Sequence, residues 1–224
     1  MIRFILGRLI KAVFILLAIL VFNFLLIHAA PGDPAAVMAG EAGAADEKFL
    51  ADLRARFGLD QPLYMQLWLY IKGAVQLDLG YSFRQQMPVA EMIGDRLPAT
   101  LLLTGVAFVL SLVLGVTAGV AASARQGRWG DTLISTFALL FYATPLFWVA
   151  LMATLVFSVW LEWLPGFGYS TIGAGYTGFA HVLDVAKHLV LPASTLGLFF
   201  TAIYMRMTRA SMLEVSRLDF VKTA

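Results

Sequence analysis

Long runs of apolar residues alternate with shorter polar segments along this chain. Four runs, at about residues 9–29, 97–124, 132–161 and 189–205, are close to or above the roughly 20 residues that a helix needs to cross a bilayer. Beyond Lys11, none of them contains Asp, Glu, Lys or Arg. The third run exceeds one bilayer thickness, so its helix must tilt, kink or extend past the lipid. The pattern predicts an all-α polytopic membrane protein whose first run is a retained span.

The polar segments carry helical patterns as well. In "ADEKFLADLRARFG", Phe49, Leu53 and Phe57 recur at every fourth position opposite charged residues, which predicts an amphipathic helix that ends at Gly58. The following "QPLYMQLWLYIKGAVQ" predicts a second helix with a proline near its start. Residues 162–187 are rich in glycine and aromatic residues and predict an irregular loop at the outer membrane surface.

Two of the runs contain residues with a special conformational or packing role. Pro145, in "LLFYATPLFWVALM", interrupts the hydrogen-bond ladder of the third run and should bend its helix. Tyr142 and Thr144 beside it could present polar groups to a lumen, so these three residues are candidates for lining a pathway. Gly115 and Gly119 form a small-xxx-small pair, which predicts a site of close helix packing.

Composition strengthens the membrane interpretation. The 224 residues are 60% apolar and 13% charged, whereas soluble domains are about half apolar and a quarter charged. A net charge of +2 is better explained by orienting charges beside spans than by a nucleic-acid surface, so no nucleic acid is expected as a partner. The absence of cysteine excludes thiolate chemistry, iron–sulfur clusters and disulfides.

Three clusters of basic residues lie beside the runs. Short flanks rich in Lys and Arg remain in the cytoplasm, and four alternating spans place all three clusters on one face. The N-terminus, the turn after the second run and the segment after the fourth run are therefore predicted to be cytoplasmic. The clusters are Arg3, Arg8 and Lys11; Arg125 and Arg128; and Arg206, Arg209, Arg217 and Lys222.

The sequence offers little for catalysis or for ion coupling. None of the five lysines follows a glycine, so the chain lacks the Gly-Lys-[Ser/Thr] loop that cradles nucleotide phosphates. No serine lies in a Gly-x-Ser-x-Gly elbow. The lack of ionisable groups inside the spans counts against a proton- or ion-coupled transporter. No catalytic or cofactor-binding residue is predicted.

One cluster has the residue types of a metal site. His181, Asp184 and His188, in "HVLDVAKH", could in principle hold zinc. Their spacing matches no zinc signature and no second carboxylate is nearby, so polar side chains at the lipid–water boundary explain them more simply. No metal site is predicted. His28, at the end of the first run, is interpreted in the same way.

The order of several short motifs resembles one family, the inner-membrane permease subunits of peptide/nickel ABC importers, in the oligopeptide and dipeptide permease branch. The likeness covers the whole chain and includes an "LDLGYSF" segment in which Leu77 replaces the family's usual glycine. The motifs are "MIRFILGRLIKAV", "APGDP", "FGLDQPLYMQLWLY", "LDLGYSF", "PVAEMIGDRLPATLLL", "LGVTAGVAAS", "WLPGFG", "KHLVLPASTLGL", "YMRMTRASMLEV" and "DFVKTA".

The resemblance implies the MetI-like transmembrane fold of type I ABC importers, of which this chain would hold the N-terminal four of a usual six spans. Residues 1–30 would be the cytoplasmic N-terminus and first span, and 31–96 a periplasmic segment with amphipathic helices. Residues 97–224 would begin the transmembrane core, with spans at about 97–124, 132–161 and 189–205.

The resemblance also gives a role to the end of the sequence. In this family the stretch continues as "TARAKG", the counterpart of the EAA loop that permeases present to their ATPases, and the sequence would stop within it. Asp219 suits a helix N-cap, with a first turn behind it. The residues of this partial coupling loop would be Asp219, Phe220, Lys222, Thr223 and Ala224.

The implied partners are a second homologous permease subunit, two cytoplasmic ATPase subunits that use ATP-Mg, a periplasmic or lipid-anchored solute-binding protein, and the lipid of a bacterial inner membrane. The substrate would be selected mainly by the binding protein. Two other functions stay open: a structural or regulatory membrane protein complete at this length, and an intramembrane metal-dependent hydrolase that uses His181, Asp184 and His188.

Overall fold

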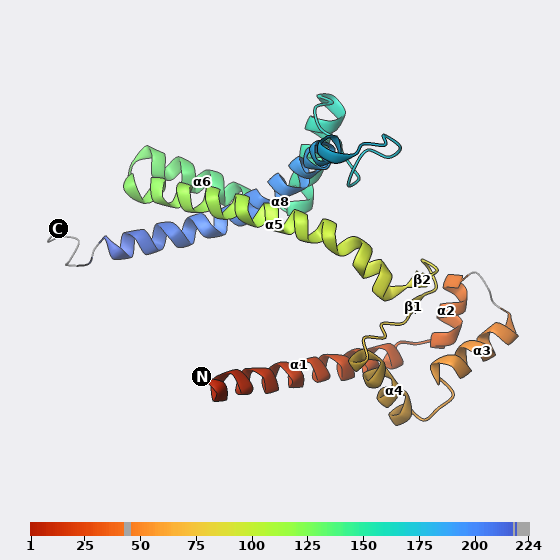
Figure 1. Ribbon diagram of the computed structural model, residues 1–224. Coiled ribbons are helices and arrows are strands. Elements are labelled where there is room, and N and C mark those ends of the chain that lie inside the picture. Colours follow the sequence, from red (N-terminus) through yellow and green to blue (C-terminus); the bar gives the residue numbers. More distant parts are fainter. Residues whose placement is uncertain (43–45, 217, 219–224) are drawn as a thin grey trace. The chain divides into compact units, whose positions relative to one another are not determined.

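The computed structural model describes residues 1–42, 46–216 and 218, and these are mostly helical (Figure 1). The chain divides into two compact units, Met1–Arg96 and Leu97–Ala224. One short ribbon interrupts the helices of the described part: β1 (Tyr81–Ser82) pairs antiparallel with β2 (Met87–Pro88). The expected all-α class is confirmed, with this ribbon as a local exception.

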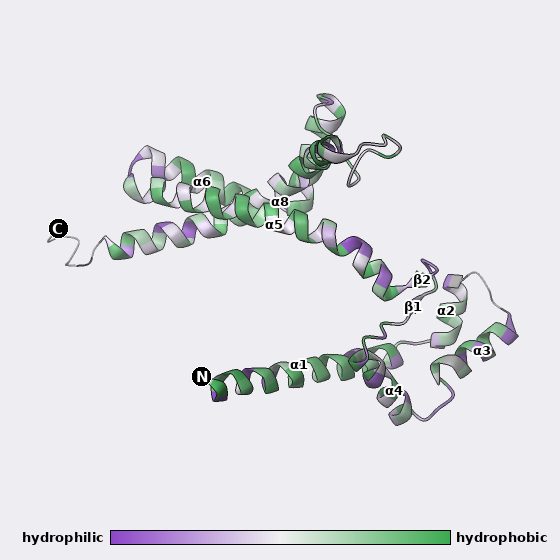
Figure 2. Ribbon diagram, in the orientation of Figure 1, coloured by the Kyte–Doolittle hydropathy of each residue, from purple (hydrophilic) through white to green (hydrophobic). Residues whose placement is uncertain are grey.

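The first unit begins with a long apolar helix, α1 (Ile2–Ala29). Figure 2 shows that α1 is hydrophobic along most of its length. Of its described residues only Phe24 is buried, against His28 and Tyr70, and His28 Nε2 lies 2.9 Å from Gln66 Oε1. Exposed apolar side chains all around a helix are favourable in lipid and unfavourable in water. The predicted first span is confirmed as a helix suited to a bilayer.

The other helices of this unit enclose a small core. Leu53 is buried with Ala35 and Ala39, and Phe49 and Phe57 pack against them, so the predicted amphipathic face is the buried one. A hydrogen bond from Arg54, and after it the N–H of Ala35 at 3.0 Å, hold the pKa of the Asp33 carboxyl below its usual value. The helices are α2 (Pro34–Ala42), α3 (Glu47–Phe57) and α4 (Leu63–Val75).

Helix α4 ends in a turn that places Leu77 in a left-handed conformation, with φ of 60°. The N–H of Asp78 donates to Gly73 O at 2.9 Å, and the N–H of Leu77 donates to Ala74 O at 3.2 Å. These two bonds are those of a Schellman motif, in which the left-handed position favours glycine. Gly58 has φ of 62° in the same position after α3. The structure thus explains why leucine is an unusual residue at position 77.

We expect Leu77→Gly to stabilise this turn by about 1 kcal/mol, because the Cβ that strains the left-handed backbone is removed. Hydrogen exchange, read by mass spectrometry over residues 70–82, should become slower. Gln76→Gly is the matched control: Gln76 has φ of −83°, so glycine there only adds flexibility and should speed exchange. Equal exchange in Leu77→Gly and the unaltered protein would contradict the expected strain.

The second unit contains most of α5 (Val89–Ala124), which is followed by α6 (Trp129–Ala143), α7 (Leu146–Thr154), a π-helical turn η1 (Leu155–Trp160) and α8 (Gly178–Val215). In the described part of the chain, α1, α5 and α8 are each long and apolar enough to cross a membrane. The broken pair formed by α6 and Leu146–Trp160 makes a fourth crossing if it is counted as one span. Four crossings agree with the four apolar runs.

One expectation from the sequence is wrong in detail. The fourth helix begins at Gly178, so residues 178–187 are helical and the irregular loop covers only 162–177. The polar residues in this stretch end the apolar run, but they do not end the helix, whose backbone bonds are internal. The apolar run that starts near residue 97 lies inside α5, whose helix already begins at Val89.

Candidate functional site

The third apolar run folds into two helices that meet at 97°. The break lies at Thr144 and Pro145: the Thr144 N–H and hydroxyl both donate to Leu140 O, at 3.1 and 2.7 Å, and Pro145 has no N–H with which to continue the ladder. Trp148 and Val149 then donate to Pro145 O and start α7. The predicted bend at Pro145 is confirmed, and it is sharp enough to be called an elbow.

A cavity of about 740 Å³ lies in the elbow. Thr144 and Pro145 contribute to its wall together with apolar and aromatic side chains of α6, α7 and η1, such as Phe141, Trp148 and Met152. The elbow therefore produces a concave, mostly apolar surface with Thr144 as a polar group on it.

Tyr142 lies against α8 and is not among the residues that line this cavity. Its ring stacks on Phe199 with centroids 5.8 Å apart, and the guanidinium of Arg206 lies 4.5 Å from the Tyr142 ring centroid. The structure thus separates the three candidate pathway residues: two belong to the elbow cavity, and Tyr142 belongs to the contact between α6 and α8.

Helices α5 and α8 approach each other closely at Gly115 and Gly119. A Cβ on Gly115 would lie 2.5 Å from Tyr204 Cβ, and one on Gly119 would lie 2.6 Å from Thr208 Cβ and 2.8 Å from Met205 O. The buried face of α5 continues at intervals of three or four residues; its buried members are Ala107, Ser111, Gly115, Gly119 and Ala122. Sequence reasoning missed Ala107 and Ser111, although the same small-residue spacing includes them.

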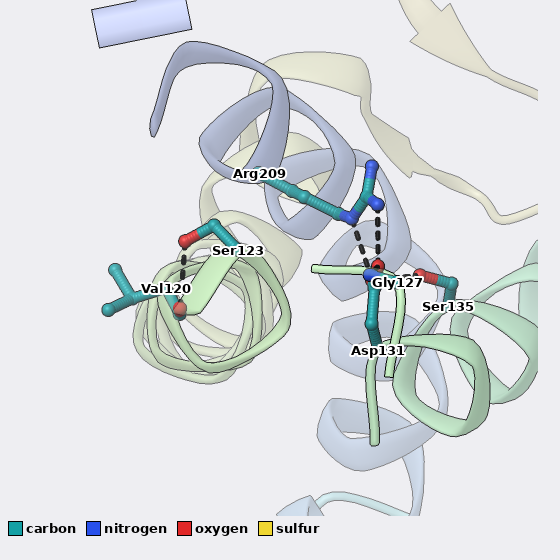
Figure 3. A network of polar contacts seen from close by, with 6 residues as sticks. All are labelled: Val120, Ser123, Gly127, Asp131, Ser135 and Arg209. Atoms are coloured by element: carbon teal, nitrogen blue, oxygen red, sulfur yellow. Dashed lines mark hydrogen bonds and ion pairs between the residues drawn. The ribbon is translucent and has the colours of Figure 1, made fainter. Parts of the chain in front are cut away.

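A buried carboxylate joins α6 to α8 (Figure 3). Arg209 donates from Nε to Asp131 Oδ1 at 2.8 Å and from Nη2 to Oδ2 at 2.7 Å. Asp131 also accepts the N–H of Gly127 at 3.2 Å and the Ser135 hydroxyl at 3.3 Å, and it is only 6% exposed. Because Asp131 is buried, loss of Arg209 would leave its carboxylate without a cationic partner, which is unfavourable.

Sequence reasoning missed this pair because Asp131 lies just before the third apolar run and Arg209 just after the fourth, 78 residues away. From the sequence, Arg209 is only one of the basic residues that orient the spans. A lone acid at the edge of an apolar run is a usable signal, since a carboxylate near the lipid needs a cationic partner.

Asp184 on α8 is a second buried acid, and it holds the irregular loop of residues 162–177 against this helix. Its Oδ2 accepts the Thr171 N–H and its Oδ1 the Thr171 hydroxyl, both at 2.7 Å. His188 Nδ1 donates to Asp184 O at 2.8 Å. The described residues contain no group of three or more His, Cys, Asp or Glu residues arranged to hold a metal. Both carboxylate oxygens of Asp184 are thus used by the loop.

The predicted coupling residues Asp219, Phe220, Lys222, Thr223 and Ala224 lie outside the residues that the structure describes, as does Arg217 of the third basic cluster. Helix α8, which precedes them, is described to its end at Val215.

Comparison with protein families gives matches over nearly the whole sequence. Residues 1–104 match the model described as the N-terminal region of binding-protein-dependent transport system membrane components. Residues 111–224 match the model described as the binding-protein-dependent transport system inner membrane component. The second match includes α6, α7 and α8 and most of the small-residue face of α5.

Curated proteins are similar to this chain from end to end. It is 39% identical, over 98% of its length, to a putative peptide transport system permease protein of Brucella abortus, and it covers 68% of that protein. It is 36% identical to a dipeptide transport system permease protein of Alkalihalophilus pseudofirmus, over 100% of this chain and 71% of the relative. It is 38% identical to a glutathione transport system permease protein of Escherichia coli K12, over 100% of this chain and 68% of the relative.

Proposed function

The chain belongs to the family of binding-protein-dependent transport system inner membrane components, and on that premise we propose that it forms half of the pathway by which an ABC importer takes up peptides or a related small solute. As a member of this family it is a membrane-embedded permease component. The observation that carries the proposal is the similarity at 36–39% identity, along the entire chain, to proteins named as peptide, dipeptide and glutathione permeases.

The partners follow from what one permease chain lacks. A second homologous permease subunit would supply the other half of the pathway. Two cytoplasmic ATPase subunits would bind ATP-Mg and hydrolyse it, which is supported by the absence of a phosphate-cradling loop from this sequence. A periplasmic or lipid-anchored solute-binding protein would deliver the ligand. The chain itself would hold no cofactor and perform no hydrolysis.

The orientation is proposed from charge. Basic residues beside the spans support a bacterial inner-membrane location with a cytoplasmic N-terminus. The segment that follows α8, which includes Asp219, would then also face the cytoplasm, where it would dock on an ATPase. Residues 31–96 would face the periplasm.

Transport would proceed by alternation between inward-facing and outward-facing states, whose populations ATP binding shifts. The elbow would contribute to the pathway: Thr144 and Pro145 through the cavity, and Tyr142 through its contact with α8. Gly115 and Gly119 would keep α5 and α8 at close distance as the core moves.

Uptake measurements test the proposal. In a host whose other peptide importers have been deleted, removal of this gene should lower uptake of a radiolabelled dipeptide to the level of a strain that lacks the ATPase genes. A plasmid copy should restore it, and uptake of the free amino acids should not change. If the deletion strain takes up labelled dipeptide, tripeptide and glutathione at the parental rate, the proposed function is wrong.

A further inference from the structure

Helix α8 holds both ends of α6 with arginine side chains. Arg209 forms its two bonds with Asp131, in the first turn of α6. Arg206 lies over Tyr142, in the last turn of α6 and two residues before the elbow at Thr144. Because the two contacts lie at opposite ends of one short helix, a shift of α8 relative to the rest of the core must carry α6 with it or break them.

The contact at Asp131 is the more rigid of the two. A guanidinium that meets a carboxylate through two parallel bonds fixes both distance and angle, which a single bond cannot do. The same carboxylate accepts from Gly127 in the turn between α5 and α6, so Asp131 ties this turn, α6 and α8 together (Figure 3). Asp131 is buried, whereas Arg209 is about one-third exposed.

We propose that the Arg209–Asp131 pair is the positioning contact that transmits displacement of α8 to α6, and through α6 to the elbow that carries Thr144 and Pro145. The inference rests on the proposed function, in which the segment after α8 receives the movement of an ATPase. Arg209 and Asp131 touch no substrate in this scheme; they determine whether α8 and α6 move as one body.

A merely structural role would have a different signature. A contact that only stabilises the fold lowers the amount of assembled protein, and ATP hydrolysis and uptake then fall together. A contact that transmits movement leaves hydrolysis in place and lowers the solute imported per ATP hydrolysed. The ratio of uptake to hydrolysis therefore separates the two roles.

The test uses the full-length protein, assembled with its partner subunits and binding protein in proteoliposomes. For Arg209→Gln we expect the ratio of dipeptide uptake to ATP hydrolysis to fall about tenfold, within the usual range of coupling between sites. Asp131→Asn should do the same, and the double variant should be no worse than either single one because both changes break one contact. Arg128→Gln, an exposed arginine in the turn before α6, is the matched control and should keep the original ratio.

Several results would overturn the inference. One is an unchanged ratio of uptake to hydrolysis in Arg209→Gln. Another is a double variant in which this ratio falls by the product of the two single-variant factors, which would mean that Arg209 acts on a partner other than Asp131. If Arg209→Gln does not assemble, Arg209→Lys, which keeps the charge but loses the paired geometry, decides by the same ratio. Failure of the proposed function looks different, since the unaltered protein itself would then show no ATP-dependent uptake.

Discussion

Gly119→Leu is expected to abolish uptake, because α5 and α8 cannot pack with a side chain at this position. The first carbon of that side chain would already lie 2.8 Å from Met205 O and 2.6 Å from Thr208 Cβ. A backbone oxygen cannot rotate away as a side chain can, so the helices must separate. Forcing extra volume into a packed core costs typically about 1–3 kcal/mol, and here the whole leucine must be accommodated. Protein amount in the membrane, melting temperature in detergent and uptake should all fall.

Gly105→Leu provides the matched control on the same helix. A Cβ at Gly105 would meet nothing within 4 Å, and both substitutions gain the same helix propensity over glycine. Gly105→Leu should therefore leave melting temperature and uptake unchanged or slightly improved. Unaltered uptake in Gly119→Leu would show that α5 and α8 do not cross at this glycine.

The sequence predicted those features of the fold that depend on local chemistry. A long uncharged run must bury its backbone bonds in a helix whatever its neighbours are, so the four apolar runs correspond to helices or to a broken pair of helices. The same holds for Phe49, Leu53 and Phe57, whose spacing alone defines the buried face of α3. The bend at Pro145 follows from the missing N–H, although its angle does not.

The features that the sequence did not predict depend on tertiary contacts. The early start of α8 is one: His181 and Asp184 indicated the end of a span, but a buried acid is tolerated in a helix when Thr171 supplies both donors. The Arg209–Asp131 pair is another, since charge patterning places a basic residue beside a span without identifying its partner. The coupling loop, inferred from family resemblance, remains a prediction.

Asp184→Leu is expected to release the loop of residues 162–177 from α8. The substitution removes both carboxylate oxygens of residue 184, which accept the Thr171 N–H and the Thr171 hydroxyl, each at 2.7 Å. Hydrogen bonds to charged groups contribute about 1.5–3 kcal/mol each, so the loop should lose most of the free energy that holds it. A cavity of about 270 Å³ is lined by Gly166, Phe167 and Gly168 of this loop and by His188 of α8. Hydrogen exchange over residues 166–175 should rise sharply, and uptake should fall with it.

Asp184→Asn separates the loss of hydrogen bonds from the loss of charge. Its amide oxygen can still accept the Thr171 N–H, and its amide nitrogen can donate to the Thr171 hydroxyl, so this variant keeps two bonds of nearly the same shape. Exchange in the loop should then rise only slightly, and uptake should stay near its original rate. If Asn and Leu at position 184 gave equal exchange, the negative charge would be what holds the loop; if neither changed exchange, Thr171 would not be its anchor.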